Sequence, residues 1–190
     1  MPTLAGCALL CHPHPLHGGT LHNKVVYTLA RALQGRGLAT LRFNFRGVGA
    51  SAGSYGEGRG EIEDARYAAA VLRERYPHRP LVVAGFSFGA MVAAHVAGVA
   101  APNWLITVAP AVEREELAAG AVRRPDCPWL LVQGEADEIV NPQAVQRWAQ
   151  AFSPPPTLRL LPGVGHFFHG RLHELTDAVT VEAVAAGFGD

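Results

Sequence analysis

The stretch Val82-Val83-Ala84-Gly85-Phe86-Ser87-Phe88-Gly89-Ala90-Met91 runs from β-branched residues into a Gly-x-Ser-x-Gly pattern and then into small apolar residues. This order is typical of a strand that turns sharply into a helix at the serine. Glycine on either side lets the strand and the helix approach closely. Ser87 is therefore a candidate nucleophile, although such a turn also occurs where phosphate binds or where two elements only pack tightly.

Composition limits the classes of protein that fit. The chain has 190 residues, of which 49% are hydrophobic and 17% charged, so we expect a single domain over residues 1–190. Because 16 basic residues balance 16 acidic ones and no block of like charge occurs, neither nucleic acid nor an anionic membrane is an expected partner. No signal peptide is evident, and no apolar run approaches the ~18 residues of a membrane span, so we expect a cytoplasmic protein. The three cysteines, Cys7, Cys11 and Cys127, are expected to be reduced thiols.

Apolar runs alternate with amphipathic segments along the whole chain. The expected strands are Leu4–Cys11, Leu38–Phe43, Leu81–Ala84, Trp104–Val108, Trp129–Val132 and Leu158–Leu161. The expected helices cover residues 20–34, 61–76, 90–100, 141–152 and 172–186. Strands that are apolar throughout are covered on both faces, which favours a parallel sheet between helix layers. The fold class is therefore α/β, with a doubly wound, mainly parallel sheet of about six strands.

The loops that follow the strands carry the residues with chemical function. Ser87 follows the third expected strand, Asp137 the fifth and His166 the sixth. In a parallel sheet these strand ends lie at one edge, where ligands bind. Serine, acid and histidine in this order along the chain are one arrangement of a catalytic triad.

The chain resembles the α/β-hydrolases, and is similar to the small, lidless bacterial serine hydrolases grouped near the dienelactone hydrolases. The resemblance is carried by five motifs, at residues 12–13, 45–51, 85–89, 134–140 and 165–168. Dienelactone hydrolases have cysteine where this chain has Ser87, so lactone specificity is not implied. Relatives usually have an antiparallel strand pair before the first parallel strand, but only three residues precede Leu4. Many also insert a lid where residues 110–128 have room for one short helix, over Glu113 to Ala119.

The resemblance implies a role for each site residue. His166 is expected to be the general base and Asp137 the acid that orients it, with Glu135 and Glu138 as rival acids and His169 and His173 as rival bases. The backbone N–H groups of Phe88 and of the loop after the first strand are expected to form the oxyanion hole. In that loop Pro13 and Pro15 have no N–H, which leaves His14 or Leu16, and the family pattern favours His14.

These residues predict a serine hydrolase that cleaves small carboxylic esters or thioesters through an acyl-enzyme and needs no cofactor. An acyltransferase with the same triad is an alternative. A second alternative is a non-catalytic module that binds a small anionic ligand at Gly18-Gly19-Thr20, if a helix starts there.

Three further expectations concern residues outside the triad. A metal site formed by His12, His14, His17 and His22 is not expected, because no carboxylate or cysteine ligand recurs beside them at a metal-site spacing. Arg46 and Ser51 are expected to fix the loop after the second strand, with substrate-carboxylate binding by Arg46 left open. With no strand before Leu4, strand 38–43 has an unpaired edge, which predicts either a homodimer through this edge or a longer natural polypeptide.

Overall fold

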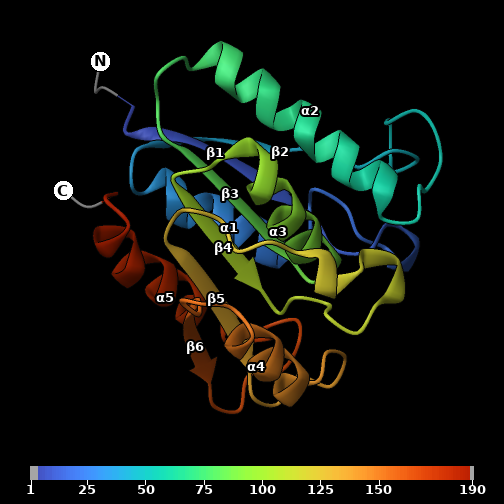
Figure 1. Cartoon of the computed structure of the whole chain (residues 1–190), viewed down its shortest axis with the longest axis vertical. Coiled ribbons are helices and arrows are strands. Elements are labelled where there is room, and N and C mark those ends of the chain that lie inside the picture. The colour runs from blue at the N-terminus through green and yellow to red at the C-terminus, as the bar shows by residue number, and fades with distance from the viewer. Residues whose placement is uncertain (1–3, 189–190) are drawn as a thin grey trace.

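The computed structural model describes residues 4–188, and its centre is a six-stranded parallel sheet (Figure 1). The strands are β1 (Gly6–Cys11), β2 (Leu38–Arg42), β3 (Leu81–Phe86), β4 (Trp104–Val108), β5 (Trp129–Gly134) and β6 (Thr157–Leu161). Their order across the sheet is β2-β1-β3-β4-β5-β6, and every neighbouring pair is parallel. The predicted α/β class and doubly wound parallel sheet are confirmed.

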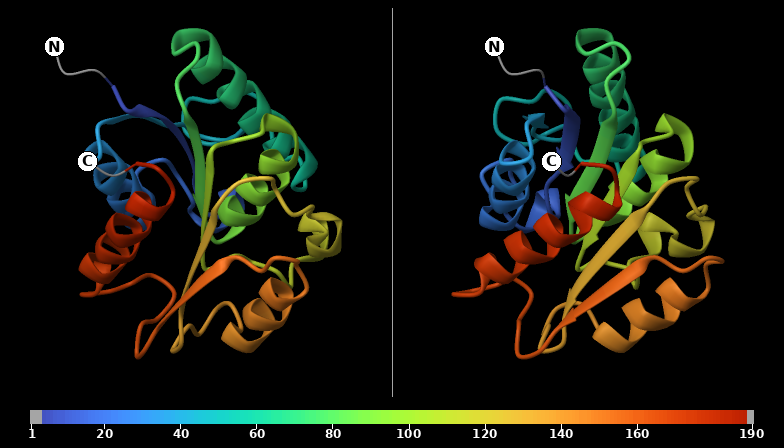
Figure 2. Two further views of the ribbon diagram at one scale, coloured as in Figure 1. Left: turned by 60° about the vertical axis from the view of Figure 1, so that its left-hand side comes forward. Right: turned by 90° about the vertical axis from the view of Figure 1, so that its left-hand side faces the viewer.

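Helices cover both faces of this sheet (Figure 2). They are α1 (Lys24–Gln34), α2 (Arg59–Arg75), α3 (Phe88–Ala100), α4 (Pro142–Gln150) and α5 (Leu172–Ala185). Helices α1 and α5 pack into one buried cluster, whereas α2, α3 and α4 pack into a second cluster on the opposite face. Strands β1, β3, β4 and β5 contribute residues to both clusters, which explains why their sequences are apolar throughout.

Two predicted elements differ from the structure by more than two residues at an end or in kind. Helix α1 begins at Lys24 rather than at residue 20, because the Asn23 side chain accepts hydrogen bonds from the N–H groups of Val25 and Val26 and caps the helix there. The segment after β4 forms two short 3-10 turns, Glu115–Leu117 and Ala119–Ala121, rather than one helix over 113–119. Ala118 separates the two turns in a left-handed conformation, with φ at 41°, which interrupts a continuous helix.

Strand β2 lies at one edge of the sheet and β6 at the other. Within residues 4–188 the outer edge of β2 has no strand partner, as the sequence predicts. Association through this edge, or its pairing with an additional segment, stays a prediction. All three cysteines are free thiols, two of them buried. In the described part of the chain, no helix is long and apolar enough to cross a membrane.

The sheet order also positions the site. The connection after β1 leads to α1 on one face, and the connection after β3 leads to α3 on the other. The loops after these two neighbouring strands therefore diverge and leave a crevice at the carboxyl end of the sheet.

Candidate active site

Ser87 occupies the sharp turn between β3 and α3. Its φ and ψ are 57° and −116°, a conformation that a non-glycine residue adopts at a cost of about 1–3 kcal/mol. The flanking glycines make this turn possible. A Cβ at Gly85 would lie 2.1 Å from the carbonyl oxygen of Gly89, and a Cβ at Gly89 would lie 2.3 Å from the carbonyl oxygens of Cys11 and His12. The Gly-x-Ser-x-Gly pattern is thus explained by packing of the strand, the helix and the end of β1.

Asp137 and His166 meet beside this turn, although they are 29 positions apart in the chain. His166 Nδ1 lies 2.8 Å from Asp137 Oδ2, and both side chains are almost completely buried. The second carboxylate oxygen, Asp137 Oδ1, accepts the backbone N–H of Ile139 at 2.9 Å and that of Val140 at 2.7 Å. With Asp137 bonded to Nδ1, the Nε2 atom of His166 is the ring nitrogen left for a reacting group.

The surroundings keep Asp137 ionised. Burial raises the pKa of its carboxyl group, but hydrogen bonds from the His166 imidazole and from the N–H groups of Val140 and Ile139 outweigh that effect. The net pKa is below the ordinary value for aspartate. A carboxylate held in this way can stabilise a positive charge on the imidazole.

The rival residues have other positions. Glu135 and Glu138 are exposed, and Glu138 Oε2 accepts the backbone N–H of His166 at 3.2 Å rather than bonding its ring. His169 and His173 do not line the cavity at Ser87. Among the candidate acids and bases, only Asp137 and His166 therefore form a pair beside Ser87.

Gln133 is a site residue that sequence analysis missed. Its side chain is fully buried at the end of β5, and its Nε2 donates to Asp137 Oδ2 at 3.0 Å. Asp137 Oδ2 thus has two fixed donors, one from His166 and one from Gln133. The available signal was a polar residue directly after the apolar run that ends at Val132.

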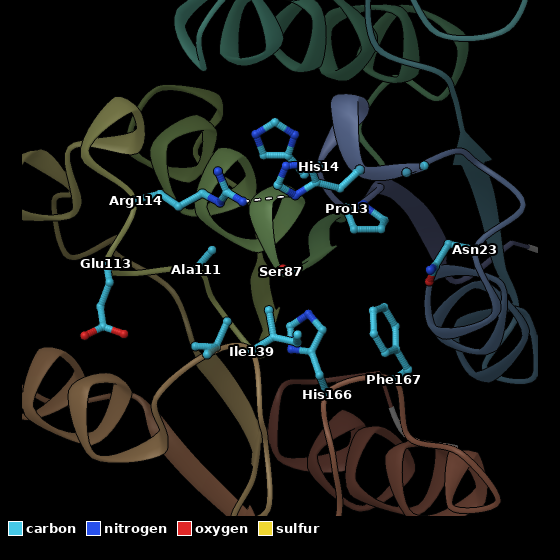
Figure 3. A pocket seen from close by; sticks show the side chains of 14 residues that line it. Pro13, His14, Asn23, Ser87, Ala111, Glu113, Arg114, Ile139, His166 and Phe167 are labelled. Atoms are coloured by element: carbon cyan, nitrogen blue, oxygen red, sulfur yellow. Dashed lines mark hydrogen bonds between the residues drawn. The ribbon is translucent and has the colours of Figure 1, made fainter.

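Ser87 and His166 line one cavity of about 340 Å³ (Figure 3). Its lining comes from the loops after β1, β3, β4, β5 and β6 and from the N-cap of α1: Pro13, His14, His17, Gly18, Gly19, Asn23, Ser87, Ala111, Glu113, Arg114, Ile139, Val140, His166 and Phe167. Within the described residues the Ser87 hydroxyl makes no hydrogen bond to His166, and such bonds are often long before substrate binds. The exposed side chains of Ile139 and Phe167 add an apolar rim that the sequence analysis did not anticipate.

Two backbone N–H groups, those of Phe88 and His14, are candidates for binding an oxyanion, since His14 lines the same cavity as Ser87. Phe88 is the first residue of α3, where the helix dipole favours negative charge. In the loop after β1, the N–H of Leu16 is already occupied, because it donates to His14 Nδ1 at 3.1 Å. Of the two amides left open by the sequence, that of His14 is therefore the better candidate.

Two other histidines of this segment, His12 and His22, do not line the cavity. His12 is fully buried, its Nδ1 donates to the Pro13 carbonyl oxygen at 2.7 Å, and its Nε2 accepts the N–H of Phe45 at 3.1 Å. Burial lowers its pKa to about 4, so the ring is neutral. His22 is exposed and does not line the cavity. Across residues 4–188, no three histidine, cysteine, aspartate or glutamate side chains are grouped to hold a metal ion.

Arg46 and Ser51 fix the loop after β2, as predicted. Arg46 binds Asp64 of α2 through Nη2 and Nε, at 2.8 and 3.0 Å from Oδ1, and it does not line the cavity. Ser51 Oγ donates to the carbonyl oxygen of Asn44 at 2.7 Å. The stretch Gly18-Gly19-Thr20 is not at a helix start, since α1 begins at Lys24, and this removes the basis for an anion site there.

Comparisons with known proteins agree with this fold. Residues 14–125 match the family model described as Hydrolase_4, serine aminopeptidase S33. An uncharacterised protein of Rickettsia prowazekii is 33% identical over 92% of this chain and 77% of its own length. A lidless α/β serine hydrolase from Xanthomonas campestris is 42% identical, with a TM-score of 0.90 over 97% of this chain and 85% of that one. An α/β serine hydrolase homologue from Coxiella burnetii is 44% identical, with a TM-score of 0.89 over 94% and 85% of the two chains.

The sequence motifs, the parallel sheet without a lid and these relatives all lead to one assignment. The chain belongs to the α/β-hydrolase superfamily, as a lidless serine hydrolase of the Hydrolase_4 family.

Proposed function

We propose that this protein hydrolyses small carboxylic esters or thioesters, with Ser87 as nucleophile, His166 as general base and Asp137 as the acid that orients it. The proposal rests on the hydrogen bond of 2.8 Å between Asp137 and His166, together with the cavity that His166 and the strained Ser87 both line. A binding module has no need for this combination at three separate strand ends.

The reaction follows from these positions. His166 Nε2 takes the proton of the Ser87 hydroxyl while Oγ attacks the substrate carbonyl carbon, and Asp137 stabilises the imidazolium that forms. The N–H groups of Phe88 and His14 stabilise the oxyanion of the tetrahedral intermediate. His166 then gives the proton to the leaving alcohol or thiol as the acyl-enzyme forms. Water, deprotonated by His166, releases the acid by the same steps in reverse order.

The size of the site supports a small acyl group. The cavity of about 340 Å³ is at the lower end of the range for small-molecule sites. Residues 110–128, which follow β4, form only two 3-10 turns and lack the mass to enclose a long acyl chain. An extended leaving group can instead project over the exposed rim formed by Ile139 and Phe167.

The test combines active-site labelling with a substrate series. A fluorophosphonate probe should label the wild type and should not label Ser87→Ala, whereas Ser54→Ala, a change at an exposed serine, should be labelled like the wild type. Hydrolysis of p-nitrophenyl esters should be fastest with acetyl or butanoyl groups and should fall for long acyl chains. An aminoacyl anilide belongs in the series because the family description names an aminopeptidase. Equal labelling of Ser87→Ala and the wild type would refute the nucleophile assignment, and anilide cleavage faster than ester cleavage would refute the substrate class.

A further inference from the structure

The imidazole of His14 lies where three loops of the candidate site converge. His14 belongs to the loop after β1, and its side chain is 8% exposed. Its Nδ1 accepts the N–H of Leu16 at 3.1 Å, while its Nε2 lies 3.3 Å from Tyr55 Oη and 3.5 Å from Glu116 Oε1. Tyr55 comes from the loop after β2 and Glu116 from the segment after β4. The catalytic steps described above use only the backbone of His14, so this side chain has no role in them.

The hydrogen bonds define the state of the ring. A backbone N–H can only donate, so Nδ1 carries the lone pair and the proton of the neutral ring is on Nε2. From Nε2 this proton is donated to Tyr55 Oη, with the Glu116 carboxylate also close. The ring stacks on His17 with centroids 4.4 Å apart and meets the ring of Phe88 edge-on at 4.8 Å. The imidazole is therefore fixed at both nitrogens and packed against two rings.

This arrangement determines the direction of the His14 backbone. The carbonyl oxygen of His14 accepts the N–H of His17 at 3.1 Å and that of Gly19 at 3.0 Å. With the carbonyl and the side chain both bonded, rotation about the N–Cα bond of His14 is restrained, and its φ is −53°. This rotation, together with the hydrogen bond of 2.7 Å from His12 Nδ1 to the Pro13 carbonyl oxygen, sets where the peptide between Pro13 and His14 points. The chain just before this peptide is close to the start of α3, because Gly89 packs against the carbonyl oxygens of Cys11 and His12.

We propose that the His14 side chain is a positioning group for the oxyanion hole. By accepting the Leu16 N–H through Nδ1 and donating from Nε2 to Tyr55, beside Glu116, it holds its own backbone N–H toward the oxyanion. This inference rests on the proposed function. It gives Tyr55 and Glu116 a supporting role in catalysis, although neither lines the cavity at Ser87.

Neighbouring charged groups help to keep the His14 imidazole and the Tyr55 phenol uncharged. Glu116 is held by Arg114 at 3.0 Å, and Arg114 also bonds His17 at 3.1 Å, reaching toward the His14 loop across the cavity (Figure 3). Burial lowers the pKa of His14, and the charges of Arg114 and His17 lower it further, against the opposing effect of Glu116. Burial and the nearby carboxylates raise the pKa of Tyr55 to about 12. At neutral pH the imidazole and the phenol are both uncharged, as the two hydrogen bonds require.

The experiment removes the His14 side chain and then restores an acceptor for the Leu16 N–H. His14→Ala keeps the backbone N–H but loses the contacts of both ring nitrogens. The kcat for p-nitrophenyl acetate should therefore fall about 10- to 100-fold. This loss is no larger than the loss caused by deleting an oxyanion donor. KM should stay unchanged. Affinity for an alkyl boronic acid, whose adduct with Ser87 carries the tetrahedral charge, should fall by the same factor as kcat. His14→Asn should recover part of the loss, because its Oδ1 can accept the Leu16 N–H as Asn23 accepts the N–H of Val25 at 2.9 Å.

Further variants distinguish failure of the positioning role from failure of the proposed function. His22→Ala, at an exposed histidine outside the cavity, should leave kcat unchanged. If His14→Ala does not fold, Tyr55→Phe combined with Glu116→Ala removes both Nε2 partners and should lower kcat and boronate affinity together. A wild type that neither labels with fluorophosphonate nor cleaves esters would refute the proposed function itself. A labelled wild type together with unchanged kcat in His14→Ala, or with no recovery in His14→Asn, would overturn the positioning role alone.

Discussion

Protonation of His12 at acidic pH should lower the free energy of unfolding by about 3 kcal/mol. The ring is fully buried, and both of its nitrogens are used by the backbone, with Nδ1 donating to Pro13 and Nε2 accepting from Phe45. A second proton would have to be on Nε2, facing the Phe45 N–H. Burial therefore lowers the pKa to about 4 from the ordinary 6.5, with the Pro13 hydrogen bond opposing part of the effect.

The magnitude follows from proton linkage. Between pH 6.5 and 4 the unfolded chain binds a proton at His12 and the folded protein does not, so the free energy of unfolding decreases as the pH falls through this window. Above pH 6.5 the ring is neutral in both states and this loss is absent. The difference of about 2.5 between the two pKa values corresponds to a loss of about 3 kcal/mol, at about 1.36 kcal/mol for each pKa unit.

The assay is urea unfolding, monitored by tryptophan fluorescence, at a series of pH values from neutral to about pH 4, which is near the lowered pKa of His12. Asp137 and His14 also have lowered pKa values, so the wild type alone does not isolate His12. The comparison is with His12→Gln, whose side-chain oxygen can accept the Phe45 N–H but does not titrate. The variant should be less stable at neutral pH and should lose about 3 kcal/mol less than the wild type across the window. Parallel pH profiles for the two proteins would refute the reasoning.

Three predictions concern the site itself. His166→Ala should lose most of the ester hydrolysis, whereas His169→Ala, at an exposed ring outside the cavity, should stay near the wild-type rate; the opposite ranking in steady-state assays would reassign the base. Asp137→Asn should lower kcat by up to ~10⁴, as the equivalent change does in a serine protease, because an amide can favour the wrong histidine tautomer. Glu135→Gln should be close to neutral, and a larger loss there would mean that Asp137 is not the acid. Gly89→Ala should abolish fluorophosphonate labelling and lower the Tm, since its Cβ would lie 2.3 Å from two carbonyl oxygens; normal labelling would show that α3 can shift without disturbing Ser87.

Local sequence patterns predicted most of the fold. Continuous apolar runs identified all six strands, and the Gly-x-Ser-x-Gly pattern located the turn at Ser87. The start of α1 was predicted four residues too early, because apolar spacing extends to Leu21 while the cap that ends the preceding loop is the side chain of Asn23. The segment after β4 was predicted as a helix because composition does not reveal the left-handed conformation of Ala118.

The sequence by itself determined the class of the fold, the strand-turn-helix at Ser87 and the order of serine, acid and histidine. These depend on residue spacing within single elements and on the order of the elements along the chain. Only the tertiary structure decided which acid contacts His166, since Glu135, Asp137 and Glu138 lie within four positions and differ mainly in the direction of their side chains. The contact between Gln133 and Asp137, the pairing of Arg46 with Asp64 and the convergence of Tyr55 and Glu116 on His14 were likewise invisible to sequence patterns. Each of these depends on how a loop folds back after its strand, and hydrogen bonds formed over such distances along the chain leave no periodic signal in the sequence.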